Sequence, residues 1–461
     1  MKKALRIGCL LLALIMLVTA FAGCGKKDGN GDDKGGSTEL TGASLKWADM
    51  FGEEYVSERA AYEKDHPPYQ VPEELKGTTV KFATWIDHTT TEAKYAMQNF
   101  EKVTGIKVEW VQTPQGSYFD KIATAVASGT APDVYVENNE FFPNTLKVSK
   151  PLDEVKSIDM NDPIWDKGYF DFTTFGGHTY QLNARNSLWQ TVNLLFYNKK
   201  AFDENGIKTP QDYIDEDNWT VESMTQIMRD FKALNATNTG GSIAPYILAQ
   251  TYGSEIVYLK DGKFVSGLGD AALEKAFKYY LSGLKEGIMN GTQASMLKGT
   301  SAFYSVDSFG LKPTGYFKGV ESDVLGFAPM PPETVGGDYK VPSHYRAYGI
   351  VSAAQNPEGA GYFLRYFLDP YNYNWDEAFL NEEAKEFYLK ECANIDFNKK
   401  AFGFQFAVTT LLGYSGHDDT RKWNYALMRT SEAQLLTTMQ SISSEVNAGV
   451  DKANEVLAGL K

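Results

Sequence analysis

A strand–helix–strand–helix–strand pattern, beginning near Thr78, constrains the fold of this 461-residue chain more than any other feature. Three short segments are rich in β-branched and aromatic residues and are predicted to be strands. Two segments repeat apolar residues every three or four positions and are predicted to be amphipathic helices. In chain order the five segments are residues 79–86 (strand), 93–103 (helix), 106–111 (strand), 119–126 (helix) and 133–136 (strand). Such alternation with short links is typical of a parallel sheet covered by helices.

The rest of the chain continues this mixture of helices and strands. It is too long for the single hydrophobic core of one ordinary domain, so at least two lobes are expected. Helices are predicted over residues 220–234, 271–284, 362–368 and 431–460, and strands over residues 302–304, 324–328 and 348–352.

The N-terminus has the pattern of a secretory signal peptide. Three basic residues precede an uncharged run, residues 7–22, which ends in Ala22-Gly23-Cys24. This run is shorter than the roughly 20 residues that cross a bilayer as a helix, and its basic start and small residues before a cleavage point favour a signal peptide. Because Ala-Gly-Cys after an apolar run resembles the bacterial lipobox, we expect residues 1–23 to be removed and Cys24 to carry a lipid such as palmitate. The alternative is an ordinary signal peptide with an incidental cysteine.

Residues 24–44 combine glycine with charge and are predicted to form a flexible tether. Acidic and amide residues within it (Asp28, Asn30, Asp32 and Glu39) have calcium-loop spacing, but Asp33 stands where that loop needs glycine. No metal or cofactor is therefore expected. Residues 45–76 form an extension to which the sequence assigns no role.

Composition excludes several classes of partner. The formal net charge of −14, from 45 basic and 59 acidic residues, argues against nucleic-acid binding, which needs a basic surface. It also argues against electrostatic adhesion to anionic lipid, so the lipid on Cys24 is expected to provide the membrane attachment. After Cys9 leaves with the signal peptide and Cys24 is lipidated, Cys392 has no cysteine with which to form a disulfide.

Several motifs occur in the order found in a known family. They are the helix-to-strand junction at residues 100–108, Ala-Ser-Gly-Thr-Ala-Pro-Asp-Val at 127–134, Phe-Gly-Gly-His-Thr-Tyr at 175–180, Leu-Phe-Tyr-Asn-Lys-Lys-Ala-Phe at 195–202, Leu-Lys-Gly-Thr-Ser-Ala-Phe-Tyr at 297–304, and 349–351 with 356–360. Together they resemble the family 1 extracellular solute-binding proteins, the maltose-binding-protein-like lipoproteins of bacterial ABC importers. The resemblance spans roughly Thr78 to Asp369.

This resemblance implies a two-lobed α/β periplasmic-binding-protein fold. Each lobe would be a mostly parallel sheet flanked by helices, and hinge strands with several crossings would join the lobes. The implied N-terminal lobe comprises residues 77–190 and 349–415, and the C-terminal lobe comprises residues 191–345 and 416–461. The implied function is that of a monomeric, lipid-anchored protein on the extracytoplasmic face of the cell membrane, which captures an oligosaccharide and delivers it to the permease of an ABC transporter.

Recognition of a sugar requires flat aromatic faces and hydrogen-bonding side chains, because sugar rings present apolar C–H faces and a rim of hydroxyls. Ligands of open α/β sheets bind at the carboxyl ends of the strands. Those ends carry Trp85, Asp87, Glu137, Asn138 and Glu140. The resemblance adds Asn183, Arg185, Trp189, Asp307, Phe309, Tyr345, Arg346, Tyr348 and Trp423 to the expected cleft. For the aromatic residues the alternative is core packing, and for Glu137 and Glu140 it is a solvated loop.

Two other classes of protein remain open at this point. A secreted glycosidase needs two carboxylates about one bond, and Asp87, Glu140 and Asp307 are candidates. The chain nevertheless lacks Gly-x-Ser-x-Gly, His-Glu-x-x-His and Walker motifs, and it contains only five histidines, so an enzyme is not expected. The other class is a glycan-binding surface adhesin. Stabilisation by a small sugar that is not consumed distinguishes a binding protein from both.

Overall fold

The computed structural model describes residues 43–88, 93–138, 141–336, 340–344, 346–393, 401–402, 411–412 and 422–460. Its first half contains helices and strands in the predicted alternation. The elements are α2 (Ala43–Phe51), α3 (Glu53–Asp65), β1 (Thr79–Thr84), α4 (Lys94–Thr104), β2 (Lys107–Gln112), α5 (Tyr118–Ser128), β3 (Val134–Asn138), the 3-10 helices η3 (Asn144–Val148) and η4 (Leu152–Glu154), α6 (Lys167–Thr173), β4 (Thr174–Phe175) and β5 (His178–Thr179).

The second half begins with a long buried strand. Its elements are β6 (Thr191–Asn198), α7 (Lys199–Glu204), α8 (Pro210–Asp215), α9 (Val221–Leu234), β7 (Thr239–Ser242), α10 (Pro245–Thr251), β8 (Val257–Lys260), β9 (Lys263–Ser266), α11 (Ala271–Glu286), α12 (Gln293–Leu297), β10 (Ser301–Asp307), η5 (Ser308–Leu311), β11 (Leu325–Pro329), β12 (Val341–His344), β13 (Arg346–Ile350), α13 (Pro357–Leu368), η6 (Pro370–Asn372), α14 (Glu382–Glu391), β14 (Ala401–Phe402), α15 (Lys422–Met428) and α16 (Leu435–Ala458).

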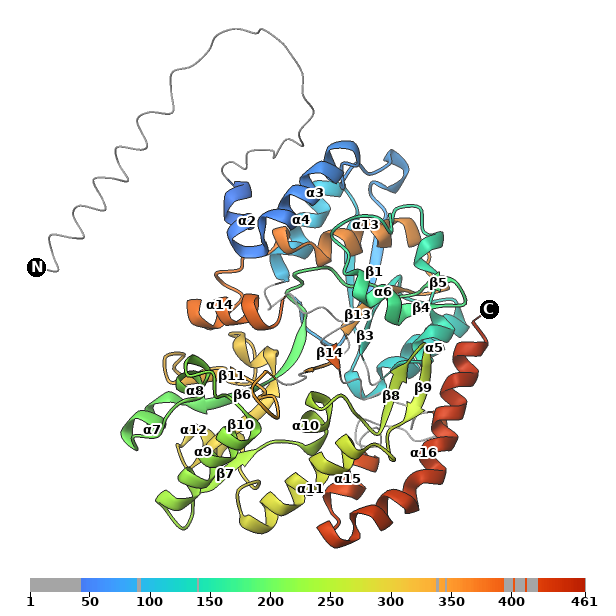
Figure 1. The fold of residues 1–461 in the computed structure, drawn as a ribbon. Helices are drawn as coiled ribbons and strands as arrows, with labels where there is room; N and C mark the ends of the chain where they lie inside the picture. The colour runs from blue at the N-terminus through green and yellow to red at the C-terminus, as the bar shows by residue number, and fades with distance from the viewer. Residues whose placement is uncertain are drawn as a thin grey trace, which may run out of the picture. The chain divides into compact units, whose positions relative to one another are not determined.

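The first sheet has the strand order β13-β3-β1-β2. β1 pairs in parallel with both β2 and β3, which confirms the predicted parallel arrangement, and β13 joins it antiparallel to β3. α4 and α13 pack on one another beside this sheet (Figure 1). α4 and α5 end where predicted, because Gly105 and Gly129 adopt positive φ angles of 75° and 72° that favour glycine.

The second sheet is mixed rather than mostly parallel. β6 is buried along its whole length and pairs antiparallel with β10, β11 and β12, whereas β7 runs parallel to β10. A strand buried on both faces has the same apolar pattern in either direction, so the sequence does not indicate which way it runs. The α/β class is nevertheless confirmed.

The chain passes between the two sheets more than once. Leu182 still forms a bridge with Tyr348 of the first sheet, and β6 begins at Thr191 in the second. On the return, β12 pairs with β6, whereas β13 pairs with β3. The chain therefore changes sheets before β6 and again between β12 and β13, and it returns to the second sheet before β14, which pairs in parallel with β12. The residues at the first two crossings lie next to both sheets.

The extension before β1 folds onto the first sheet's helices, a role that the sequence does not reveal. In α3, the Arg59 guanidinium donates to both carboxylate oxygens of Asp369, at 2.7 and 2.6 Å. Arg365 of α13 donates to the same carboxylate at 2.7 Å, and Tyr69 donates to it at 2.8 Å. Ring stacking of Trp47 on Tyr371, with centroids 4.6 Å apart, adds an apolar contact. Residues 45–76 are thus attached through a buried ionic cluster.

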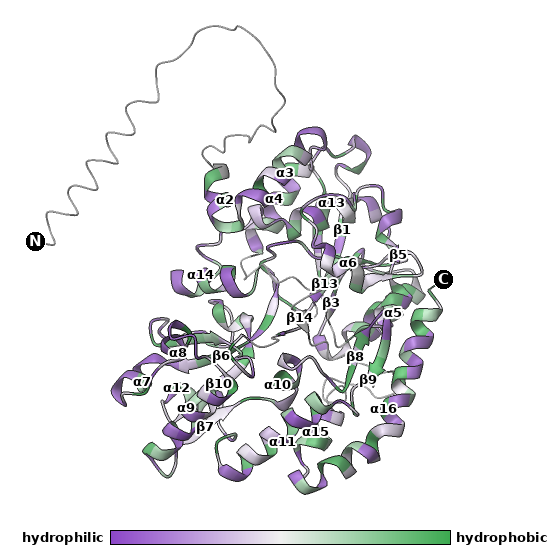
Figure 2. Cartoon of the chain, viewed as in Figure 1, coloured by the Kyte–Doolittle hydropathy of each residue, from purple (hydrophilic) through white to green (hydrophobic). Residues whose placement is uncertain are grey.

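The C-terminal helices are amphipathic. The buried residues of α16 recur along one side from Leu435 to Val456, and hydrophilic and hydrophobic stretches alternate along α11 and α16 in Figure 2. α16 packs on α11, α15 and β9. No helix in the described part of the chain has the length and apolarity needed to span a bilayer.

Candidate functional site

Trp85 lies just beyond the carboxyl end of β1 and is half-buried. The edge of its indole contacts the buried Tyr118, with ring centroids 5.0 Å apart, and Phe141, at 6.0 Å. These contacts fix the ring on the edge of the first lobe's aromatic core while part of it stays accessible. Asp87, two residues further on, is also half-buried.

Arg346 is the first residue of β13, and its guanidinium lies over the Trp85 ring at 5.6 Å from the centroid. Its backbone is fixed on two sides. It is the register partner of Asn138 in β3, and its carbonyl accepts a hydrogen bond of 3.0 Å from Asn183 Nδ2. A cation over an indole is an attractive arrangement, so Trp85 and Arg346 form a fixed pair next to the second crossing.

Asp307 and Phe309 lie at the end of β10 in the second sheet. One Asp307 carboxylate oxygen accepts from the Phe309 N–H at 3.0 Å, and the other accepts from the Tyr316 hydroxyl at 3.0 Å. The Phe309 and Tyr316 rings meet edge to face, at 5.4 Å. Tyr316 is 45% exposed, which is unusual for a large side chain in this chain. The site therefore offers an accessible aromatic face beside a carboxylate.

The charges of Asp307 and Arg346 both act on the Tyr316 phenol. Burial and the Asp307 carboxylate raise the pKa of the Tyr316 phenol, and the positive charge of Arg346 acts in the opposite direction on the same group. We call Trp85, Arg346, Asp307, Phe309 and Tyr316 the cross-sheet cluster. Trp85 follows β1 and Arg346 begins β13 in the first sheet, whereas Asp307 ends β10 of the second sheet and Phe309 and Tyr316 follow it.

Buried polar atoms surround the cluster on the connecting strands. Asn193 is the register partner of Asp307, and Ser343 is the register partner of Val192. Asn193 Nδ2, Ser343 Oγ and Arg346 Nε are all buried and form no hydrogen bond with the residues that the structure describes. Since buried polar groups are normally hydrogen-bonded, these donors are suited to the hydroxyls of a bound ligand.

Four predicted residues are almost completely buried. Glu137 accepts from Thr145 and from Gln181 Nε2, and Asn183 holds the β13 backbone. Trp189 stacks on Phe367, with centroids 5.7 Å apart. Glu137, Asn183, Trp189 and Tyr348 are all 6% exposed or less. For Trp189 and Tyr348 this geometry matches the core-packing alternative, and any part they take in binding is indirect.

Two further predicted residues make their contacts outside the cross-sheet cluster. Arg185 forms an ion pair of 2.7 Å with Glu58 of the N-terminal extension, and its guanidinium lies over Tyr55. Trp423 is buried on α15, which packs on α11 and α16. Neither contacts the cross-sheet cluster among the described residues. Cys24, Glu140 and Tyr345 lie outside the described residues, as does the side chain of Asn138.

Sequence reasoning missed Tyr316, Asn193 and Ser343. Tyr316 follows Lys312-Pro313-Thr314-Gly315, a turn sequence after a strand, and an aromatic residue in such a loop is a usable signal. Asn193 and Ser343 carry no such signal, because a single polar residue in an apolar strand shows neither its partner nor its position in a sheet.

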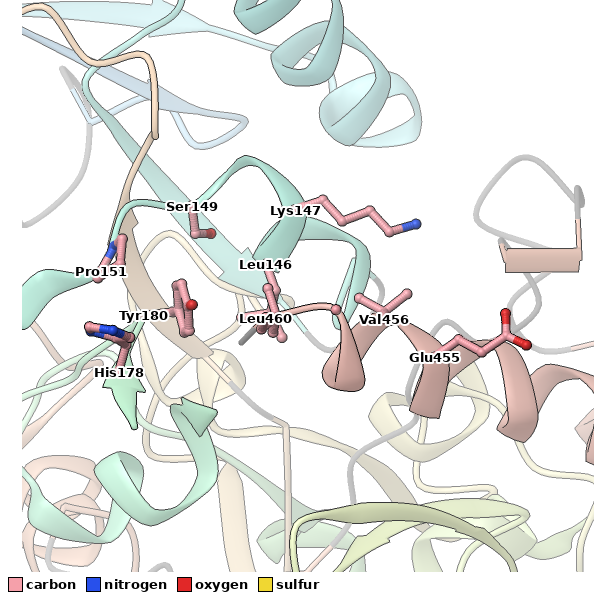
Figure 3. Close-up of a pocket in the computed structure, with 10 residues that line it drawn as sticks. Leu146, Lys147, Ser149, Pro151, His178, Tyr180, Glu455, Val456 and Leu460 are labelled. Atoms are coloured by element: carbon pink, nitrogen blue, oxygen red, sulfur yellow. The ribbon is translucent and has the colours of Figure 1, made fainter. Parts of the chain in front are cut away.

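A separate pocket of about 600 Å³ lies between η3, the β4–β5 hairpin and the end of α16. In Figure 3, His178 and Tyr180 lie at one end, and Lys147 and Glu455 extend toward the other. Two of its polar groups already form hydrogen bonds within the protein: His178 Nδ1 lies 2.8 Å from Asp153 Oδ2, and the Ser149 hydroxyl is hydrogen-bonded to the Tyr135 hydroxyl. It contains none of the predicted site residues. We therefore assign the candidate ligand site to the cross-sheet cluster.

Metal coordination does not account for the cluster. In the described ranges, no three His, Cys, Asp or Glu side chains are arranged to hold an ion. What the cluster offers is an aromatic face, a carboxylate, a guanidinium and amide and hydroxyl groups on connected strands. This is the chemistry of a binding site for a small polar solute with apolar faces.

A fold of two α/β lobes with a polar, aromatic site beside the crossing strands defines an extracytoplasmic solute-binding protein. The model of the bacterial extracellular solute-binding protein family matches residues 83–373, more than half of the chain, and this protein belongs to that family. No curated protein sequence matches the chain.

Solved structures of the same fold come from several bacteria. The GacH receptor of Streptomyces glaucescens, determined unliganded and with acarbose, aligns with a TM-score of 0.59 and 17% identity over 80% of this chain and 98% of its own. The galacto-N-biose/lacto-N-biose I-binding protein of the Bifidobacterium longum ABC transporter aligns with a TM-score of 0.58 and 14% identity over 81% of this chain and 98% of its own. A Staphylococcus aureus extracellular solute-binding protein with bound maltose aligns with a TM-score of 0.57 and 11% identity over 82% of this chain and 98% of its own. At these identities the likeness establishes the two-lobed fold.

Proposed function

We propose that this protein captures a carbohydrate at the cross-sheet cluster and delivers it to an ABC transporter. The observation that carries the proposal is that the pair Trp85 and Arg346 and the pair Asp307 and Tyr316 both lie at strand ends beside the crossing strands β6 and β12. The sugars named for the three structures of the same fold, acarbose, lacto-N-biose and maltose, support this class of ligand.

The side chains of the cluster suit the two surfaces of a sugar. The accessible part of Trp85 and the exposed Tyr316 supply flat faces for the C–H side of a ring. The Asp307 carboxylate accepts hydrogen bonds from sugar hydroxyls, while Asn193 and Arg346 donate hydrogen bonds to hydroxyl oxygens. Because these groups belong to two sheets, they all contact one ligand when the lobes close about it, and binding is coupled to hinge closure.

The lobe limits follow from the same proposal. We assign residues 77–190 and 349–415 to the N-terminal lobe and residues 191–345 and 416–461 to the C-terminal lobe. The pairing of β12 with the second sheet and of β13 with the first supports a crossing between these strands. The pairing of β14 with β12 does not support the later limit at residue 415 and favours an earlier return to the C-terminal lobe. The extension that includes α2 and α3 belongs with the N-terminal lobe, since its buried contacts are with Asp369 and Arg365. We propose that the protein acts as a monomer and binds its ligand without chemical change.

Replacing Trp85 by Ala tests the site directly. Loss of a stacking indole is expected to reduce sugar affinity by about 1–3 kcal/mol. The melting temperature should fall less than for a fully buried tryptophan, whose truncation costs about 3–5 kcal/mol. Trp110→Ala is the matched control, because Trp110 is half-buried on the adjacent strand β2 and outside the cluster. Calorimetric titration and thermal melting of both variants separate the roles. An unchanged affinity in Trp85→Ala would remove Trp85 from the site.

We also propose that Cys24 carries the lipid anchor. The Ala22-Gly23-Cys24 sequence after an apolar run supports this assignment. Changing Cys24 to Ala is expected to move the protein from the membrane fraction to the soluble fraction of a bacterial host, whereas Cys392→Ala should leave it membrane-bound. Equal membrane retention of Cys24→Ala and the wild type contradicts lipid anchoring.

A further inference from the structure

Among the described arginines, Arg346 is the one that is partly shielded from solvent and lacks an acidic partner. Arg59, Arg185, Arg229 and Arg365 each form an ion pair with a carboxylate. Arg429 has none, but it is exposed to solvent. Arg346 is half-buried, and no carboxylate of the described residues lies within ion-pair distance of it. In a chain with a net charge of −14, an unpaired and partly desolvated guanidinium is a specific feature.

The described residues around Arg346 provide no ion-pair partner for its guanidinium. The acidic member of the cluster is Asp307, whose two oxygens already accept from Phe309 and Tyr316. Arg346 Nε is buried and has no hydrogen-bond partner among the described residues. Desolvating a cation is costly unless an anion or several acceptors meet it. The unmet donors therefore point to an acceptor supplied by the ligand.

The geometry around Arg346 also restricts where that acceptor lies. Its guanidinium is over the Trp85 ring, so an acidic group that reaches it belongs to a molecule stacked near the same indole. Pairing with β3 and the bond from Asn183 fix the Arg346 backbone, which limits the motion of the side chain. A planar guanidinium with parallel N–H donors matches a carboxylate, which has two oxygens in one plane.

We propose that the ligand is an acidic oligosaccharide, in which the carboxylate of a uronic acid residue binds Arg346 while the sugar ring stacks on Trp85. This inference rests on the proposed carbohydrate function and makes it more specific. Asp307 disfavours a second negative charge on its side of the cluster, so we place one carboxylate at Arg346 and hydroxyls near Asp307.

The test uses matched sugar pairs. The purified mature chain is titrated by calorimetry with uronate disaccharides, such as digalacturonic and glucuronic-acid-containing disaccharides, and with the neutral sugars of the same linkage, which carry a hydroxymethyl group in place of the carboxylate. We expect the wild type to bind at least one acidic sugar on the order of 10-fold tighter or more than its neutral match, as for a charge-assisted bidentate contact. A sulfated disaccharide distinguishes a uronate site from a general anion site.

Arg346→Met should abolish this preference: affinity for the acidic sugar should fall on the order of 10-fold or more beyond the loss for the neutral sugar, which loses only a hydrogen bond to a hydroxyl. Arg346→Lys, which keeps the charge but loses the planar fork, should retain part of it. The melting temperature of ligand-free Arg346→Met is expected to equal or exceed that of the wild type, because Arg346 forms no ion pair among the described residues and its buried Nε has no hydrogen-bond partner there. Arg185→Met is the control: it loses the ion pair with Glu58 and should melt lower with the acidic preference unchanged.

The outcomes separate the two proposals. Tighter binding of acidic sugars that disappears in Arg346→Met supports the inference. Binding of neutral oligosaccharides with no acidic preference, or a preference that survives in Arg346→Met, overturns it and leaves the carbohydrate function standing. Preference for the sulfated sugar over the uronate overturns the assignment of a carboxylate. Absence of binding to every sugar, acidic or neutral, contradicts the carbohydrate function itself.

Discussion

Asp369→Asn is expected to lower the free energy of unfolding by about 3–5 kcal/mol, the cost of removing one partner from a buried ionic cluster. Asp369 is 1% exposed and accepts hydrogen bonds from Arg59, Arg365 and Tyr69. Burial opposes its ionisation, but the two guanidinium groups outweigh burial and hold the pKa of its carboxyl below the ordinary value. Replacing the carboxylate by an amide leaves two buried cations with less compensating charge.

Chemical denaturation of the variant and of Asp376→Asn measures this effect. Asp376 lies in the same segment, forms an ion pair of 2.7 Å with Lys385, and has a side chain that is 59% exposed. Exposed pairs contribute about 1 kcal/mol or less, so the control should lose little. Equal, small losses in both variants would show that the cluster does not hold the N-terminal extension in place.

Glu255→Gln is expected to remove a pH dependence of stability. Glu255 is 1% exposed, and burial raises its pKa from 4.5 to about 7, although hydrogen bonds from the Ile256 N–H and Gln250 Nε2 oppose the shift. The folded protein therefore keeps this proton at pH values where the unfolded chain has lost it, so stability falls as the pH rises from about 4.5 to about 7. At about 1.4 kcal/mol per pH unit, this difference corresponds to about 3 kcal/mol.

Denaturation at pH 5 and pH 8 is the measurement. Above pH 7 the wild type should be less stable than Glu255→Gln by roughly that amount, and the gap should narrow toward pH 5. Glu321→Gln, a change of an exposed glutamate in the same lobe, should follow the wild type at both values. If wild type and Glu255→Gln respond identically to pH, Glu255 is ionised in the folded protein across this range.

The sequence predicts those parts of the fold that local pattern determines. β1, α4, β2, α5 and β3 occur where the periodicity places them, because alternation, helical spacing and Gly105 or Gly129 act within a few residues. Strand direction in the second sheet could not be predicted, since β6 is apolar on both faces. The role of the N-terminal extension could not be predicted either, because Arg59 donates its hydrogen bond to Asp369, a residue 310 positions away in the sequence.

The candidate site divides in the same way. Trp85 and Arg346 could be predicted to lie at a strand end and beside a crossing, and the structure has them in contact there. Glu137 follows the same rule, yet its carboxylate bonds Gln181 inside the lobe, since the direction of a side chain depends on neighbours that a sequence does not show. Tyr316 enters the site through its hydroxyl bond to Asp307, a tertiary contact without a local pattern.

The measurement that tests the central claim most directly is calorimetric titration of the purified mature protein with a panel of neutral and acidic oligosaccharides, followed by chromatography of the recovered sugar. Saturable binding of at least one of them, with a stoichiometry of one sugar per chain, a higher melting temperature and the sugar recovered intact, is the predicted result. Hydrolysis of the sugar, or no binding to any member of the panel, would contradict the account.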